Sequence, residues 1–268
     1  MNINITISAI IFTVIVNSFP GYAKINNNES QMAMDKIVTT EKVQKPSSDE
    51  ITAAVSEKSE NNETDYISTA LKYPVISGLK DKSVENKINQ RFESEALNFR
   101  RSIEDMAKTD YEASKADSSI HFNKYEVCTE YSVKYNKNGI LSITVLYYQY
   151  TGGAHGGTNQ VGYNIDLKTG DLLPLSHMFE QGFDYKQIII NEVLNEMQKH
   201  KEYYFEDAEK TVKALDDSIL YYIEDDNIVV YYGQYEIAPY AVGILEFKVP
   251  FSKLKLSPLG LNSIKISN

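Results

Sequence analysis

The stretch YEVCTEYSVKYNKNGILSITVLYYQY, residues 125–150, predicts a β-hairpin that organises the sheet around it. Two runs rich in β-branched and aromatic residues flank Asn136–Gly139, a turn sequence that is typical of hairpins. In the second run the odd-numbered side chains from 141 to 147 point to one side, and the even-numbered ones from 142 to 148 point to the other. Both sets are partly apolar, so we expect this strand to lie inside a sheet.

More strands are expected after this hairpin. The stretch GGAHGG leads into QVGYNIDL, and KTG turns the chain into DLLPL, which together predict a meander of antiparallel strands. Nearer the C-terminus, two aromatic and β-branched runs flank a turn at Glu224–Asn227, and a further strand is expected after Gly243.

Two amphipathic helices are expected between these strands. Upstream of the hairpin, apolar residues recur at intervals of three and four and predict one core-facing stripe: Val84, Ile88, Phe92, Ala96, Phe99, Ile103 and Met106. Downstream, Asp184 is placed to cap a helix with Ile189, Val193 and Met197 on its inner face. The sequence therefore predicts an α+β fold of two subdomains, each an antiparallel sheet packed with an amphipathic helix.

The first segment predicts export. Residues 1–23 carry no charged side chain, and their apolar run ends at Pro20 with small residues at Gly21 and Ala23. This pattern predicts a secretory signal peptide, with an uncleaved membrane anchor as the alternative. We expect a secreted or extracytoplasmic protein associated with the cell envelope, which contacts the membrane only if the segment stays uncleaved.

Composition divides the rest of the chain. Residues 24–64 are polar and contain no aromatic side chain, so they are expected to form a disordered linker. Residues 65–165 and 166–256 are expected to form the two α+β domains, and residues 257–268 a tail.

Charge and cysteine content exclude several classes of function. The net charge of −10 disfavours nucleic-acid binding, which needs clustered Lys and Arg, and is compatible with a strongly basic partner. The single cysteine, Cys128, excludes an intrachain disulfide and a zinc site made of cysteines alone.

The motifs for catalysis are missing from the sequence. The four histidines lie more than twenty residues apart, so there is no closely spaced zinc pair, and no G-x-S-x-G elbow occurs. Cys128 and His155 can form a nucleophile pair only if the fold brings them together. The acids of IEDD, residues 223–226, fit a solvated turn better than glycosidic acid–base chemistry. We expect no catalytic residue, metal or cofactor; an envelope hydrolase acting on peptidoglycan or peptide is the alternative.

His155 and the tyrosines are the candidate binding residues. His155 lies among four glycines, where it can hydrogen-bond to a neighbouring strand, contact a partner, or act in catalysis. The chain has 20 tyrosines and no tryptophan, and tyrosine suits interfaces because it joins a large apolar ring to a polar tip. The candidates are Tyr148, Tyr150, His155, Tyr235 and Tyr240.

Three segments resemble known envelope proteins. LKYPVISGLKDKSVENKIN, residues 71–89, is similar to the start of a domain that precedes some peptidoglycan deacetylases. YTGGAHGGT with YNIDLKTGDLLPL, and YEIAPYAVGILEFKVPFSKL near the C-terminus, resemble RsiV-type lysozyme-sensing anti-sigma factors of Gram-positive bacteria. The resemblance covers Asp65–Leu254.

The resemblance implies a non-catalytic sensor or binding protein. By analogy with these families, its partner is expected to be a lysozyme-like protein or a cell-wall glycan. Only four residues precede Ile5 and no further domain follows Asn268, so we expect the sensor and accessory portions without a sigma-factor-binding or deacetylase portion.

Export can be tested directly. We predict that the secreted form begins at Lys24, because cleavage after Ala23 follows the small-residue rule. N-terminal sequencing of protein recovered from the medium and from the membrane fraction measures this. Recovery of Met1 on a membrane-bound product would contradict it.

Overall fold

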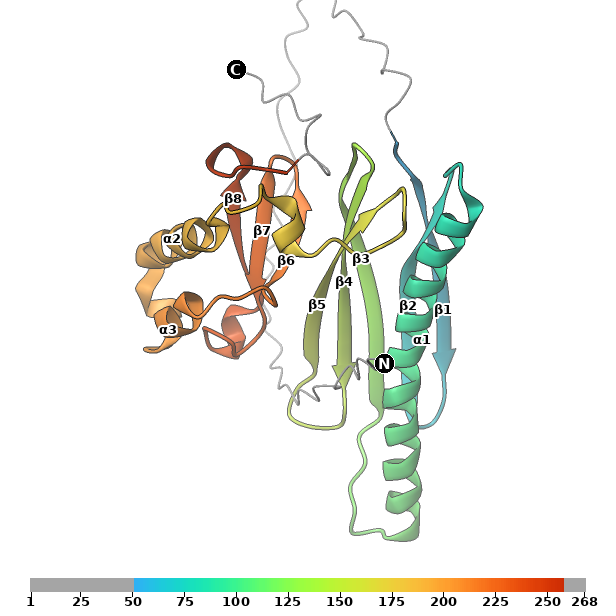
Figure 1. Ribbon diagram of the computed structural model, residues 1–268. Helices are drawn as coiled ribbons and strands as arrows, with labels where there is room; N and C mark the ends of the chain where they lie inside the picture. The colour runs from blue at the N-terminus through green and yellow to red at the C-terminus, as the bar shows by residue number, and fades with distance from the viewer. Residues whose placement is uncertain (1–50, 258–268) are drawn as a thin grey trace, which may run out of the picture.

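The computed structural model describes residues 51–257 and contains two β-sheets with helices on their outer sides (Figure 1). The signal segment, the first part of the expected linker and nearly all of the expected tail lie outside the described residues. The principal elements are β1 (Ala54–Glu63), β2 (Ile67–Ser77), α1 (Lys82–Ala116), β3 (Tyr125–Lys137), β4 (Ile140–Tyr150), β5 (Gly157–Asp166), α2 (Tyr185–Met197), α3 (Ala208–Lys213), β6 (Leu220–Glu224), β7 (Asn227–Tyr232) and β8 (Leu245–Pro250). Four short 3-10 helices complete the described chain: η1 (Leu175–Met178), η2 (Gln198–Tyr203), η3 (Tyr240–Val242) and η4 (Phe251–Lys253).

The first sheet has five strands in the order β1-β2-β3-β4-β5. The β3–β4 hairpin and the interior position of β4 are confirmed, and the turn places Asn138 and Gly139 at φ 57° and φ 80°. One pair differs from the all-antiparallel sheet expected, because β2 and β3 run parallel. The reason is that α1 lies between them in the chain, and a helix that crosses the sheet returns the next strand in the same direction.

Strand β1 corrects the last part of the prediction that residues 24–64 form a disordered linker, because residues 54–63 are ordered. Its ten residues pair antiparallel with β2 along its whole length. Most of its side chains are exposed, so the strand gives no hydrophobic signal in the sequence. Backbone hydrogen bonds to β2 therefore hold this polar segment in place.

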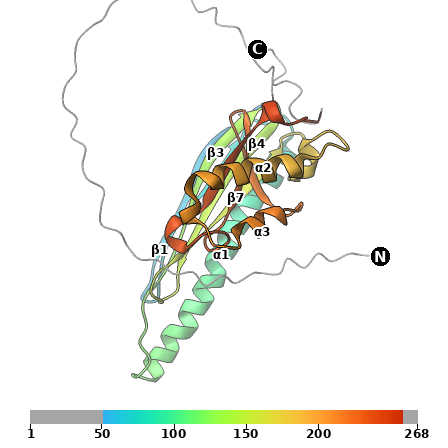
Figure 2. The same ribbon diagram turned by 90° about the vertical axis from the view of Figure 1, so that its left-hand side faces the viewer.

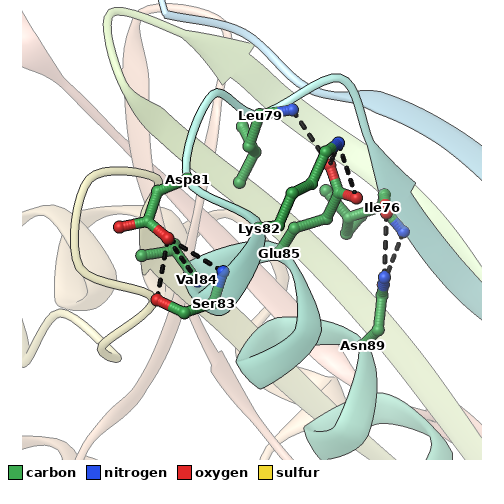
Figure 3. Close-up of polar contacts among 8 residues, drawn as sticks. All are labelled: Ile76, Leu79, Asp81, Lys82, Ser83, Val84, Glu85 and Asn89. Atoms are coloured by element: carbon green, nitrogen blue, oxygen red, sulfur yellow. Dashed lines mark hydrogen bonds and ion pairs between the residues drawn. The ribbon is translucent and has the colours of Figure 1, made fainter.

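The start of α1 is fixed by polar contacts from residues 76–89 (Figure 3). The Asp81 carboxylate accepts hydrogen bonds from the Ser83 and Val84 backbone N–H groups at 2.8 and 3.4 Å. These bonds satisfy amide donors that the first turn of a helix leaves free. Gly78 precedes the cap at φ 88°, a conformation that favours glycine.

Two further side chains of α1 tie its first turns to the end of β2 (Figure 3). The Glu85 carboxylate accepts from the Leu79 N–H at 3.0 Å and from the Lys82 ammonium at 2.8 Å. The Asn89 amide bonds both the N–H and the carbonyl of Ile76, at 2.6 and 2.9 Å. The deacetylase-like segment is therefore a strand–turn–helix junction.

Helix α1 packs its apolar stripe on one face of the first sheet. The buried residues of the stripe are Val84, Ile88, Phe92, Ala96, Ile103 and Ala107. Phe99 adds an edge contact to Tyr147, with ring centroids 5.2 Å apart. Met106, expected in the stripe, is 39% exposed, because a step of four from Ile103 brings Ala107 to the inner face instead.

The second sheet has the order β6-β7-β8 and carries α2 and α3 on its outer side (Figure 2). The cap at Asp184 is confirmed, because its carboxylate accepts from the Gln187 N–H at 3.2 Å. Ile189, Val193 and Met197 are buried against the sheet, as expected. The structure thus confirms the α+β class, with a helix on each of two sheets.

A buried polar junction joins the two sheets on the face of the first sheet opposite α1. The Ser142 hydroxyl donates to the side-chain oxygen (Oδ1) of Asn164 at 2.7 Å and accepts from the Ile223 N–H at 2.9 Å. The Asn164 amide donates to the Tyr221 carbonyl at 2.9 Å. At Gly162 the two backbones come so close that an added Cβ would overlap this same Tyr221 carbonyl oxygen. Hydrogen bonds therefore hold strand β6 against β4 and β5, and the lack of a side chain at Gly162 lets the backbones come this close.

The close approach at Gly162 gives a prediction about stability. Gly162→Ala is expected to lower the free energy of unfolding by about 1–3 kcal/mol, because the methyl group must push β6 away from β5. Urea denaturation of the protein, followed by circular dichroism, measures the change. Gly153→Ala is the matched control, since a Cβ there meets nothing within 4 Å. Equal losses in both variants would show that the junction does not limit stability.

Candidate functional site

An aromatic stack joins the loop at residues 151–156 to the C-terminal subdomain. The His155 imidazole lies nearly parallel to the Tyr240 ring, at a centroid distance of 5.0 Å and an angle of 17°. The Tyr235 ring packs on Tyr240, with the two ring centroids 5.6 Å apart. His155 is only 6% exposed, whereas Tyr235 is 45% exposed. The stack therefore runs from a buried ring to the protein surface.

Tyr148 and Tyr150 lie beside this stack, at the end of β4. The Tyr148 ring packs so closely on Gly156 that an added Cβ would lie 2.6 Å from its ring carbons. Burial raises the pKa of Tyr148, and the groups of Glu126, Tyr240 and Tyr150 add to the effect from nearby. The five candidate residues predicted from the sequence thus come together, and we call them the aromatic cluster.

Backbone geometry holds the C-terminal part of the aromatic cluster in position. Tyr235 has φ 65°, which a non-glycine residue adopts only where its surroundings enforce it. The Gly233 N–H donates to the Glu236 carboxylate, and this bond closes the turn around Tyr235. The Thr158 N–H donates to the Gln234 side-chain oxygen at 3.2 Å and links the start of β5 to the same turn. Sequence reasoning missed Gln234, because nothing in its neighbourhood distinguishes it from an ordinary loop residue.

His155 differs from the expected hydrogen-bonded loop residue. Among the described residues, neither ring nitrogen has a hydrogen-bond partner, and both nitrogens are buried. The ring is held by packing on Tyr240 instead. Burial lowers the pKa of His155, because water cannot solvate the charged imidazolium there.

The geometry does not pair His155 with Cys128 or a carboxylate. Cys128 stands opposite Tyr148 in the β3–β4 pair and is half-buried. Burial raises the pKa of its thiol, with smaller contributions from Glu126 and Glu130, so the reactive thiolate is disfavoured. Within residues 51–257 there is also no group of three His, Cys, Asp or Glu side chains arranged to hold a metal ion.

The acidic residues within 223–226 lie in the turn between β6 and β7 and have structural roles there. The Glu224 carboxylate binds the ammonium groups of Lys248 at 2.6 Å and Lys134 at 3.3 Å. The hydrogen bond from Lys248 is the main cause of the lowered pKa of Glu224. Asp225 has φ 49° and forms the turn. These carboxylates do not converge on the aromatic cluster.

An acidic, partly apolar surface surrounds Tyr148 on the face of the first sheet that β6 leaves open. Alternation along β3 and β4 places Glu126, Glu130 and Leu146 on this face, and all three are exposed. Glu246 lies at its border, where it accepts from the Gln160 amide at 2.9 Å. The aromatic cluster therefore has negative charge beside it.

Comparison with known proteins accounts for nearly all of the chain. The family model for deacetylase PdaC matches residues 60–158, and the model for a protein of unknown function, DUF3298, matches residues 176–252. Anti-sigma-V factor RsiV from Bacillus subtilis (strain 168) is 30% identical over 253 residues, which cover 91% of this chain and 78% of that protein. The chain belongs to the RsiV family. The resemblance seen in residues 150–175 and 235–254 is thereby confirmed.

More distant relatives agree with the fold of this RsiV-family chain. Peptidoglycan-N-acetylmuramic acid deacetylase PdaC from the same bacterium is 23% identical over 189 residues, which cover 69% of this chain but only 38% of that enzyme. The crystal structure of a DUF3298 family protein from Bacteroides fragilis NCTC 9343 has a TM-score of 0.59 at 20% identity and covers 77% of this chain and 94% of its own. A DUF3298 family protein from Pseudomonas aeruginosa PAO1 has a TM-score of 0.51 at 18% identity, with coverages of 77% and 95%. At these identities the two structures support the fold alone.

None of the helices between residues 51 and 257 of this RsiV-family chain has an apolar stretch long enough to cross a bilayer.

The stacked histidine of this RsiV-family chain gives a stability prediction. His155→Ala is expected to lower the free energy of unfolding by about 1 kcal/mol at pH 7.5, the usual scale of a lost aromatic contact. His155→Phe is expected to keep most of that stability, because a phenyl ring can stack on Tyr240 without nitrogen atoms to bury. Urea denaturation measures both variants.

His200→Ala is the matched control for this prediction. His200 also stacks on a tyrosine, Tyr203 at 5.2 Å, but both side chains are exposed. If His200→Ala costs as much stability as His155→Ala, burial of the stack contributes nothing measurable.

Proposed function

We propose that this chain is an extracytoplasmic binding protein that senses a lysozyme-like protein through the aromatic cluster. One observation supports this proposal above all. The five residues lie together beside the junction of the two subdomains, although they come from two separate segments of the chain. The relative RsiV is named an anti-sigma-V factor, and this relationship favours a sensor in such a pathway.

The chemistry of the aromatic cluster suits a protein interface. Tyrosine rings bury a large area and lose little side-chain entropy, because only two torsions must be fixed. Tyr235 is exposed next to the half-buried Tyr240, so a partner can cover Tyr235 while Tyr240 supports it from below. Such rings are frequent among the few residues that supply most of the binding energy.

Charge supports a basic partner. Residues 1–23 contain no charged side chain, so the remaining chain carries the whole net charge of −10. Exposed Glu126 brings part of it to the face that holds Tyr148, whereas the charge of Glu130 is paired with Lys72 at 2.9 Å. Lysozymes of the animal type are basic, so long-range attraction is expected to speed their association.

A cell-wall glycan is the second candidate ligand. Sugar rings also stack on tyrosine, and the PdaC relative is named for its action on peptidoglycan. A role as envelope hydrolase has less support, because His155 has no carboxylate or thiol partner with which to activate water or a nucleophile.

Binding kinetics test the proposal. We predict that lysozyme binds the mature chain, that added salt mainly slows association, and that Tyr235→Ala or Tyr148→Ala speeds dissociation by about tenfold through loss of an aromatic anchor. Surface plasmon resonance with the chain immobilised measures both rate constants. Tyr203→Ala is the matched control variant, because Tyr203 is 48% exposed and lies outside the aromatic cluster.

Two further analytes decide between specific and general binding. Cytochrome c has a similar positive charge, so equal affinity for it would reduce the interaction to electrostatic adhesion. Purified peptidoglycan fragments test the glycan. Unchanged dissociation of lysozyme from both tyrosine variants would show that the aromatic cluster is not the contact surface.

A further inference from the structure

His155 is the only one of the four histidines that is buried; His121, His177 and His200 are all exposed. Its two ring nitrogens have no hydrogen-bond partner among the described residues. A neutral imidazole in this position leaves one donor and one acceptor unpaired. A protonated imidazolium would bury two unpaired donors and a full charge, which is far less favourable.

The titratable groups that face this loop do not supply a counter-charge. Tyr240 from η3, Tyr148 from β4 and Tyr235 from the turn before η3 are phenols. Their faces can attract a cation, but more weakly than a carboxylate does. Burial is the cause that lowers the pKa of His155.

The carboxylates nearest this loop form no hydrogen bond or ion pair with His155 among the described residues. The Glu236 carboxylate accepts from the Gly233 N–H. Glu126 lies on the face that holds Tyr148 and Tyr150. At the other end of the loop, His121 bonds Asn123 at 3.0 Å, and Asn123 donates to the Gly152 carbonyl at 2.8 Å. His121 is therefore the other histidine that hydrogen bonds connect to this loop.

The loop has the backbone freedom to release the ring. Gly152 has φ 81°, which favours glycine, and Gly153 has open space where a Cβ would be. Gly156 lies directly against the Tyr148 ring, so movement of His155 also removes packing that holds Tyr148 in place. The loop thus packs against the tyrosines of the aromatic cluster and is joined to Tyr240 by one stacked ring.

We propose that loop 151–156 is an acid-sensitive latch on the aromatic cluster: protonation of His155 releases its ring from Tyr240 and weakens ligand binding there. The effect on binding rests on the function proposed above, whereas the latch itself does not. The open loop takes up a proton near pH 6.5, the ordinary value for histidine, and the closed loop only at lower pH. The closed form is therefore fully favoured above pH 6.5 and is lost as the pH falls below it.

Proton NMR of the ligand-free mature chain tests the latch. Four histidines give four resolvable Cε1–H signals, and His155→Phe assigns one of them. We expect the His155 signal to titrate below pH 6.5, the ordinary value for histidine, and the Tyr240 ring signals to shift with the same midpoint. The latch is overturned if His155 titrates at or above pH 6.5, or if the Tyr240 signals do not follow it.

Lysozyme binding then tests the consequence. The Kd is expected to rise from pH 7.5 to pH 5.5 by up to about tenfold, because protonation of the open loop at a pKa near 6.5 can favour it by at most that factor over this range. His155→Phe should reduce that rise to less than about twofold, whereas His121→Gln and His200→Gln should retain it, which also controls for titration of lysozyme itself. A full rise in His155→Phe, or its loss in His121→Gln, would overturn the assignment to His155. Absence of binding at pH 7.5 would instead refute the proposed function, while the NMR titration still decides on the latch.

Discussion

The arrangement of the whole molecule depends on the close contact between β5 and β6. Gly162 lets the two backbones meet, and the buried hydroxyl of Ser142 and amide of Asn164 supply the hydrogen bonds that the meeting strands need. A buried polar group without a partner costs free energy. Other alignments of β6 against β5 would break these hydrogen bonds and are therefore disfavoured. This alignment places the turn that carries Tyr235 and Tyr240 beside the end of β4.

Part of this organisation could be predicted from the sequence because it is local. The Asn136–Gly139 turn, the stripe of α1 and the Asp184 cap follow from spacing and residue type, and the structure confirms them. The parallel pairing of β2 with β3 and the strand β1 depend on neighbours distant in sequence. A polar strand such as β1 has no hydrophobic pattern, so composition alone assigned it to the linker.

Residue type and family resemblance were enough to predict the candidate residues. The contacts between them could not be predicted in this way. Tyrosines near two family-like segments predicted the members of the aromatic cluster, since large amphipathic rings are the usual anchors of interfaces. The stacking of His155 on Tyr240 could not be predicted, because it requires the two subdomains to be docked first. The deacetylase-like segment 71–89 was also found by resemblance, but it contributes nothing to the aromatic cluster. Its polar residues form the hydrogen bonds at the N-terminus of α1.

Strand β1 bears on how copies of this protein meet one another. Within residues 51–257 it is the outer strand of the five-stranded sheet, so one row of its backbone groups has no strand partner there. The sequence AVSEKSENNE places Glu57, Lys58, Glu60 and Glu63 along that edge. Glu60 and Glu63 pair with Arg100 and Lys124 of the same molecule, and the strand offers few apolar side chains to another sheet. Charged residues along an edge strand disfavour its pairing with a second sheet. The same polar composition that conceals β1 in the sequence thus disfavours edge-to-edge pairing of two molecules.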